Sequence, residues 1–251
     1  MMTTPFDRPI AHRGLHDRSR GIIENSASAF EAAIARGFAI ECDLQLSGDG
    51  AILVFHDHDL QRLTGRDGNI HELAGNEICA MPLLDSASGD TPQLFAQFLE
   101  QIAGRVPLVV EIKQQPTAAG NAEIAEKSVE IARDYRGPLV FKSFDPTVLK
   151  AVRKAGYSGQ LGIITYGYRT PEWDGHIPAH RRFMLRHLLH WPLSRFTFIS
   201  CERTALDLPA VRFFRTFGMN VMSWTVREKA HVPGVRAQAD QIVFEGFDPE
   251  A

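Results

Sequence analysis

Short apolar runs alternate with stretches of helical periodicity along nearly the whole chain, and this alternation limits the possible folds more than any other feature. The runs predict strands at residues 8–12, 38–46, 51–55, 107–113, 139–143, 160–165, 196–201, 220–225 and 241–244. Helical patterns follow most of these runs, at residues 26–37, 92–103, 122–133, 146–154, 179–190 and 209–217. Such a succession of βα units is typical of a mostly parallel sheet covered by helices.

The length of 251 residues matches the usual size of one closed α/β barrel. Nine predicted strands are one more than such a barrel needs, so we expect one of them to lie outside the closed sheet or to be spurious. The turn Gly48-Asp49-Gly50 leaves too little chain for a crossover helix before the third strand. We therefore predict an α/β fold, a TIM (β/α)8-type barrel that is irregular at its second and third strands, with residues 1–251 forming a single domain.

Composition excludes several classes of protein. Hydrophobic residues make up 44% of the chain and charged residues 23%, which argues against a disordered chain. A net charge of −3 gives no general basic field for a nucleic acid. The N-terminal residues lack the pattern of a secretion signal, and no apolar run reaches the roughly 18 residues of a membrane helix. Together with three widely spaced cysteines, these features predict a cytoplasmic protein without integral membrane contact, and they leave its oligomeric state open.

Charged or titratable side chains recur where four successive strands are predicted to end. They are His12 and Arg13, Glu41 and Asp43, His56 and Asp57, and Glu111 and Lys113. In a parallel barrel, function collects at the carboxyl ends of the strands. We therefore expect these side chains to meet at the barrel mouth.

Spacing of two residues places side chains on the same side of a strand, which applies to Glu41 with Asp43 and to Glu111 with Lys113. Three carboxylates gathered at one mouth repel each other unless a cation lies between them. Oxygen ligands suit Mg²⁺ or Ca²⁺ better than zinc. The acidic residues thus predict a divalent metal site, and the alternative is that they only form ion pairs with Arg13 and Lys113.

Two histidines complete this set. His12 and His56 end the first and third predicted strands, and a pair of imidazoles that titrate near neutral pH can act as general base and general acid. Asp57 follows His56 directly and is suited to orient a histidine. Arg13 and Lys113 supply positive charge for a phosphate. These residues together predict a site for phosphoryl chemistry.

Several sequence blocks resemble the glycerophosphodiester phosphodiesterase family. The specific blocks are AHRG at 11–14, ENSASAFEAAIARG at 24–37, IECDLQLSGDG at 40–50 and VFHDHDLQRLTGRDG at 54–68. Weaker matches are EIK at 111–113, Ser143-Phe144 and SWTV at 223–226. The blocks occur in order over nearly the whole chain, and the first half carries the more specific ones.

The resemblance implies a TIM-type barrel that hydrolyses small glycerophosphodiesters to sn-glycerol 3-phosphate and an alcohol, with Ca²⁺ or Mg²⁺ as the metal. By position, His12 and His56 match the catalytic histidines of the family. Matching in the same way are the metal ligands Glu41, Asp43 and Glu111, the phosphate-contacting Arg13 and Lys113, the loop pair Glu24 and Asn25, and the pocket aromatics Phe144 and Trp224. The last strand, at residues 240–247, departs from the family pattern, so the resemblance does not define the floor of the glycerol pocket.

The expected mechanism uses one histidine to deprotonate the nucleophile and the other to protonate the leaving alcohol. We favour His12 as the base, and either water or a glycerol hydroxyl fits as the nucleophile. An alternative function is phospholipase-D-like cleavage of lysophospholipids or sphingolipids. A third interpretation, a binding protein that has lost catalysis, is disfavoured because both histidines and all three acids are present.

Residues 176–195 carry an unusual number of histidines and arginines. His176 and His180 are four residues apart, as in many zinc sites, but no carboxylate lies between them in the usual arrangement. The arginines lie among apolar residues such as Phe183 and Trp191, a pattern compatible with an anionic membrane or a partner helix. We favour the simpler interpretation, in which the apolar residues of this segment pack against the barrel.

Overall fold

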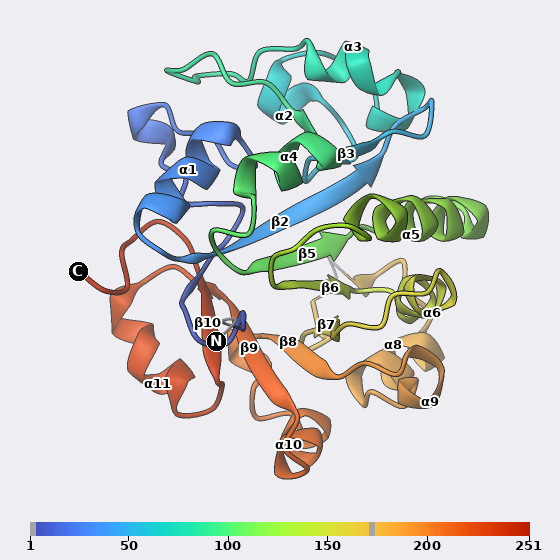
Figure 1. Cartoon of the computed structure of the whole chain (residues 1–251). Coiled ribbons are helices and arrows are strands. Elements are labelled where there is room, and N and C mark those ends of the chain that lie inside the picture. Colours follow the sequence, from blue (N-terminus) through green and yellow to red (C-terminus); the bar gives the residue numbers. More distant parts are fainter. Residues whose placement is uncertain (1–3, 171–173) are drawn as a thin grey trace.

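The computed structural model describes residues 4–170 and 174–251 (Figure 1). Within these residues, eight parallel strands close into a TIM-type α/β barrel. The strands are β1 (Ile10–Ala11), β2 (Ala39–Leu46), β5 (Leu108–Ile112), β6 (Leu139–Ser143), β7 (Leu161–Thr165), β8 (Phe198–Glu202), β9 (Asn220–Val226) and β10 (Gln241–Phe244). Closure comes from β1, which pairs with β10 through Ile10 and Val243 and with β2 through Ile10 and Ala39.

One of the nine predicted strands, at residues 51–55, lies outside the closed barrel, as we expected from the strand count. It is β3 (Ile52–Val54), which runs antiparallel to the far end of β2, where Leu46 is paired with Ile52. A further short strand, β4 (Gln93–Leu94), pairs antiparallel with β3 and was not predicted. The expected irregularity is therefore a hairpin on β2, because the short turn after β2 allows only an antiparallel return.

Helices surround the barrel, with α1 and α4 on one side in Figure 1 and α5, α6, α8 and α9 on the other. The α-helices of the described residues are α1 (Ala27–Ala35), α2 (Gln61–Thr64), α3 (Gly75–Cys79), α4 (Phe95–Ile102), α5 (Ala118–Ala132), α6 (Pro146–Lys154), α8 (Ala179–Arg186), α9 (Trp191–Ser194), α10 (Pro209–Thr216) and α11 (Val232–Arg236). The 3-10 helices are η1 (Arg18–Arg20), η2 (Ile70–Glu72), η3 (Arg203–Ala205) and η4 (Lys229–His231).

Capping side chains set where two of these helices begin. The Ser26 hydroxyl accepts a hydrogen bond from the Ala29 amide at 3.3 Å, which confirms Ser26 as the N-cap of α1. Helix α5 begins at Ala118, four residues before its predicted start, because Thr117 caps it by accepting from the Gly120 amide at 3.0 Å. None of the helices in the described part of the chain is both long and apolar enough to cross a bilayer.

An apolar layer gathers where most of the barrel strands begin. Its members are Ile10, Ala39, Val109, Val140, Phe198, Met222 and Val243, one from each barrel strand except β7. Strand β7 has Gly162 in this region, where an added Cβ would lie 2.2 Å from the Phe198 ring. The glycine therefore makes room for the largest side chain of the layer, which closes the barrel interior.

The segment 176–195 differs in part from the expectation. Leu185 and Leu188 are buried against the barrel, but Phe183 is 58% exposed, so the packing interpretation is wrong for Phe183. Trp191 is 36% exposed, and the covered part of its ring packs against Phe214. The helix also ends at Arg186 instead of 190, before the separate turn α9. His176 and His180 are exposed and belong to no close group of metal-binding side chains among the described residues.

Buried His190 predicts a pH dependence of stability. Burial lowers the pKa of His190 to about 4, and its Nδ1 lies 3.0 Å from the Ser194 hydroxyl. The unfolded chain binds this proton near pH 6.5, so the fold loses stability as the pH falls from 6.5 towards 4. Between pH 7 and pH 5 this loss is about 2 kcal/mol in the free energy of unfolding. In urea titrations, His190→Gln should lose less free energy of unfolding between pH 7 and pH 5 than the unchanged chain does. An equal loss in both proteins would contradict the assignment of this pH dependence to His190.

Candidate active site

The candidate site lies one layer above the apolar layer, because side chains two residues further along a strand point the same way. Ile10 is followed by His12, Ala39 by Glu41, Val109 by Glu111, Val140 by Lys142, Met222 by Trp224 and Val243 by Glu245. A period of two therefore places a second layer above the apolar plug, with charged or titratable side chains from five strands and the Trp224 indole from β9.

Three carboxylates form the centre of this mouth. One oxygen from each of Glu41, Asp43 and Glu111 lies within 4.8 Å of the other two, and all three residues are buried. Strand register explains this convergence, since Asp43 on β2 is the Cα partner of Glu111 on β5. Three oxygen donors at this spacing fit a hard divalent cation such as Ca²⁺ or Mg²⁺.

Three cationic side chains approach the same carboxylates. Lys113 Nζ lies 2.7 Å from Asp43 Oδ1 and 2.6 Å from Glu111 Oε1. Lys142 Nζ lies 2.9 Å from Glu41 Oε1, and Arg13 Nε lies 3.5 Å from Asp43 Oδ2. The ion pairs expected with Arg13 and Lys113 therefore form, and a bound metal would compete with the Lys113 ammonium for Asp43 and Glu111.

These cations keep the buried acids ionised. Burial alone would raise the pKa of Asp43, but Lys113, His56 and Arg13 outweigh it and hold the pKa well below its usual range. Burial likewise opposes ionisation of Glu41, but Lys142 lowers the pKa of this carboxyl. For Lys113, burial opposes the charge while Asp43 and Glu111 raise its pKa. The mouth is thus a network of ionised groups whose charges compensate each other.

His12 and Glu245 form a histidine–carboxylate pair across the seam where the barrel closes. His12 Nδ1 lies 2.8 Å from Glu245 Oε2, and His12 Nε2 lies 4.0 Å from Glu41 Oε2. Burial would raise the pKa of Glu245, but His12 and Arg227 outweigh it and lower the pKa to about 2. Glu245 is therefore an ionised partner that orients the imidazole, so that Nε2 lies on the side of the ring nearer Glu41.

His56 and Asp57 form a second pair of the same kind. His56 Nδ1 lies 2.6 Å from Asp57 Oδ1, as expected from their adjacency. The hairpin of β2 and β3 brings them to the mouth, where the Phe55 amide donates to the Asp43 carbonyl at 3.0 Å. The side-chain Nε2 of Gln45 donates hydrogen bonds to the backbone carbonyls of His56 and Asp57 at 3.0 and 3.2 Å, and these bonds hold the loop in place.

Glu24 and Asn25 support the site from the loop after β1. Asn25 Nδ2 donates to Asp43 Oδ2 at 2.9 Å, and Arg13 Nη1 donates to Glu24 Oε1 at 2.7 Å. Arg13 and Asn25 both adopt left-handed backbone conformations, with φ of 57° and 52°. Left-handed backbone at residues other than glycine is strained and concentrates at functional sites. Here it allows the Arg13 amide to donate to Glu41 Oε2 at 3.1 Å.

A cavity of about 440 Å³ opens above these groups. His12, Arg13, His56, Glu111, Lys113 and Lys142 line it, together with Phe144 and Trp224. The rings of Phe144 and Trp224 meet edge to face at 5.6 Å, and the Trp224 indole donates to the Ser200 carbonyl at 3.0 Å. Both aromatic residues named from the sequence thus form one wall of the cavity that holds the two histidines.

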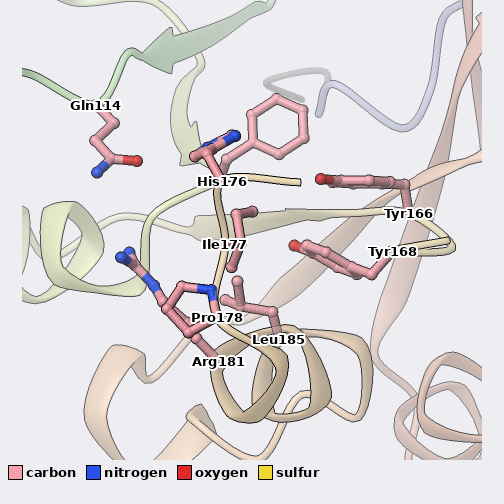
Figure 2. Close-up of a pocket in the computed structure, with 9 residues that line it drawn as sticks. Gln114, Tyr166, Tyr168, His176, Ile177, Pro178, Arg181 and Leu185 are labelled. Carbon is pink, nitrogen blue, oxygen red and sulfur yellow. The ribbon is translucent and has the colours of Figure 1, made fainter. Parts of the chain in front are cut away.

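A second cavity of about 310 Å³ adjoins the first at Phe144, which lines both. Figure 2 shows Tyr166 and Tyr168 lying side by side in this second cavity, with their hydroxyl ends towards Ile177. Their ring centroids are 4.0 Å apart, and Leu185 and Pro178 from the region of α8 complete an apolar wall. An aromatic cavity therefore lies next to the charged one, with Phe144 as their common lining residue.

The structure brings together the site residues named from the sequence, and it adds three that were missed. Lys142 and Glu245 follow the apolar layer by two residues, so the period-two rule was the available signal for both. Arg62 bridges Asp57 at 2.6 Å and Glu24 at 2.7 Å from the short helix α2. Its position follows from a loop conformation for which the sequence has no comparable signal.

Known proteins are similar to this chain over nearly its whole length. The profile of the "Glycerophosphoryl diester phosphodiesterase family" matches residues 12–245. A glycerophosphodiester phosphodiesterase of Caldanaerobacter subterraneus subsp. tengcongensis is 24% identical over 250 residues, covering 96% of this chain and 94% of the relative. Lysophospholipase D of Mus musculus is 24% identical over 259 residues, covering 94% of this chain and 72% of the relative.

Solved structures share the fold. The structure of an Oleispira antarctica phosphodiesterase in complex with the product sn-glycerol-3-phosphate superposes with a TM-score of 0.78 at 22% identity. The alignment covers 99% of this chain and 97% of that chain. This chain therefore shares its overall fold with that phosphodiesterase.

The ion pair of Lys142 with buried Glu41 predicts a large loss of stability when it is broken. Lys142→Met leaves the Glu41 carboxylate without its ammonium partner, which costs about 3–5 kcal/mol for a buried pair. Urea unfolding at pH 7 in the presence of a chelator measures this loss. Lys150→Met removes an exposed lysine from α6 and serves as the control, with an expected change below about 0.5 kcal/mol. A Lys142 variant as stable as this control would contradict the assigned pairing.

Proposed function

Because the chain belongs to the glycerophosphoryl diester phosphodiesterase family, we propose that it hydrolyses glycerophosphodiesters to sn-glycerol 3-phosphate and an alcohol. The observation that carries this proposal is the meeting of three buried carboxylates and two histidine–carboxylate pairs at one barrel mouth. The sn-glycerol-3-phosphate found in the Oleispira antarctica phosphodiesterase supports the choice of product.

Arg13 and Lys113 are proposed to hold the phosphate of the substrate. Both line the charged cavity, and both are cationic groups suited to phosphate oxygens. Glu41, Asp43 and Glu111 would hold Ca²⁺ or Mg²⁺, as the donor set fits a hard cation. When bound, such an ion supplies electrostatic stabilisation of the charge that develops on the phosphate oxygens. Asn25 and Glu24 keep Asp43 and Arg13 in position.

His12 and His56 are proposed to transfer the protons of the reaction. Each has its Nδ1 beside an ionised carboxylate, which leaves Nε2 as the nitrogen that can face the substrate. One imidazole removes a proton from water or from a glycerol hydroxyl as that oxygen attacks phosphorus. The other donates a proton to the alcohol oxygen as its bond to phosphorus breaks. When the glycerol hydroxyl attacks, the first product is a cyclic phosphate, and water then breaks one of its two P–O(glycerol) bonds to give sn-glycerol 3-phosphate. We retain His12 as the base, with His56 as the acid.

A second candidate substrate class is the lysophospholipids, which the apolar cavity beside the site favours. The aromatic cavity of Tyr166 and Tyr168 meets the charged cavity at Phe144 and offers about 310 Å³ for an apolar group. Small glycerophosphodiesters with polar headgroups do not need such a lining. Sphingolipids, the other lipid substrates considered, would need a similar apolar surface.

One assay tests the function and the metal together. The purified protein is incubated with glycerophosphocholine, glycerophosphoethanolamine or a lysophospholipid, in chelator or in added Ca²⁺ or Mg²⁺, and free glycerol 3-phosphate or lysophosphatidic acid is measured. We expect product from the small diesters only when a divalent ion is present. Product formed in an excess of chelator would contradict the proposed metal dependence. Product from the lysophospholipid alone would favour the second candidate substrate class. If no diester gives product, the proposed enzymatic activity is wrong.

Replacing either histidine should reduce turnover strongly. His12→Ala and His56→Ala are each expected to lower kcat by roughly 10²–10⁴-fold, because each removes a proton-transfer group. The rate of glycerol 3-phosphate release measures this, with His180→Ala as a control from the exposed start of α8. Near-normal turnover in His56→Ala would remove that residue from the chemistry.

The proposal extends to the compartment. Cys42, Cys79 and Cys201 are all free thiols, and Cys42 and Cys201 are buried. Unpaired cysteines are typical of proteins in a reducing environment. We therefore retain a cytoplasmic location as part of the proposed function.

A further inference from the structure

Exposed apolar side chains are concentrated on one part of the surface. Among the described residues, seven of the eight large apolar side chains that are exposed lie at positions 183–193 and 213–217. They are Phe183, Met184, Leu189, Trp191, Leu193, Phe213 and Phe217, with exposed fractions from 36% to 76%. Single exposed apolar residues are ordinary, but a group of this size usually marks an interaction site.

Ring contacts join the two segments into one face. The Trp191 ring lies 6.2 Å from Phe214, which lies 5.5 Å from Phe213, and Phe213 lies 5.0 Å from Phe217. In Figure 1, α8 and α9 lie next to each other on the outside of the barrel, with α10 further along the same edge. We call this surface, formed by residues 179–195 and 209–217, the arginine–aromatic face.

The charge of this face is opposite to that of the whole chain. Residues 175–201 and 208–217 contain no aspartate or glutamate, but they contain Arg181, Arg182, Arg186, Arg195, Arg212 and Arg215. Two of these arginines pair with acids from other elements, Arg181 with Asp145 at 3.2 Å and Arg215 with Asp240 at 3.6 Å. Because the chain as a whole carries a charge of −3, the remainder of the molecule is distinctly acidic.

We propose that the arginine–aromatic face docks the protein on an anionic lipid bilayer. Helices that carry Arg together with Trp, Phe and Leu lie in the interface of a bilayer, with the apolar side chains among the acyl chains and the arginines at the phosphates. Arg195 illustrates the arrangement, since its guanidinium lies 5.3 Å from the Trp191 ring centroid. A second copy of the chain is the less suitable occupant, because two such faces would bring Arg195 and Arg212 of each copy together. The carboxylates of Asp145 and Asp240 beside this face already pair with Arg181 and Arg215.

Three neighbouring cavities lie behind this face, and one of them is the cavity of the candidate active site. A groove of about 370 Å³ has Met184 and Leu193 of the face on its lining, and it shares Gln114, Arg181 and Leu185 with the aromatic cavity. The aromatic cavity in turn meets the charged cavity at Phe144. The groove, the aromatic cavity and the charged cavity thus lie in sequence behind the docked surface, each sharing at least one lining residue with the next. An amphiphile held at this surface would lie close to the candidate active site.

Co-sedimentation of the full chain with lipid vesicles tests the docking. The experiment requires no catalysis, so a negative result would contradict the docking without contradicting the proposed hydrolysis. The vesicles are pure phosphatidylcholine or phosphatidylcholine with phosphatidylglycerol, at low and high salt. We expect binding only to the anionic vesicles, weakened by salt. Arg195→Gln/Arg212→Gln should reduce the partition coefficient by about 25-fold, at about fivefold for each arginine. Phe183→Ser/Phe217→Ser should reduce it by at least about tenfold.

Matched variants elsewhere on the surface provide the controls. Arg133→Gln/Arg136→Gln removes two exposed arginines near the end of α5, and Leu84→Ser removes the exposed apolar residue that lies outside the face. Both should bind anionic vesicles like the unchanged chain, and thermal melting should show that every variant is folded. Equal partitioning onto neutral and anionic vesicles, or no loss in either face variant, would overturn the proposal. A dimer that forms without lipid and is lost in Phe183→Ser/Phe217→Ser would overturn it in favour of a second copy.

Discussion

Burying three carboxylates side by side is the constraint on which the rest of the molecule depends. Each unpaired charge would cost several kcal/mol, so the fold is stable only if compensating cations arrive at the same place. Arg13, Lys113 and Lys142 provide them from the end of β1, the end of β5 and the body of β6. Strands β1 and β5 flank β2, and β6 lies on the other side of β5. Their register sets Asp43 beside Glu111 and Glu111 beside Lys142. Electrostatics and strand order therefore support each other.

The antiparallel hairpin solves a separate problem, which is how a histidine from outside the barrel reaches its mouth. Strand β2 pairs with β1 at Ala39 and Ile40 and continues to Leu46, where β3 pairs with it and returns. The return ends beside Asp43, so His56 arrives at the level of the acids. Arg62 binds Asp57 in this loop and also binds Glu24 in the loop after β1. Glu24 in turn accepts a hydrogen bond from Arg13. The two histidine loops are thus linked through one ion-pair network.

Much of this arrangement was predictable from the sequence, because it follows from periodicity. The barrel, the extra strand and the convergence of Glu41, Asp43 and Glu111 follow from apolar runs, a short turn and a spacing of two. Lys142 obeys the same spacing but was overlooked within an otherwise apolar strand, and Glu245 lies in the region that departs from the family pattern. Arg62 and the exposure of Phe183 and Trp191 depend on how loops and short helices settle on the barrel, which local pattern does not encode.

The contact between His12 and Glu245 joins residues separated by 233 positions of the chain. Its backbone counterpart is the hydrogen bond from the His12 amide to the Phe244 carbonyl at 3.0 Å, at the seam between the first and last strands. The orientation of the His12 imidazole therefore depends on β10 being paired with β1. Without β10, the acids and both histidines are still present, but the ring of strands is open beside β1 and His12 has no carboxylate partner at the seam.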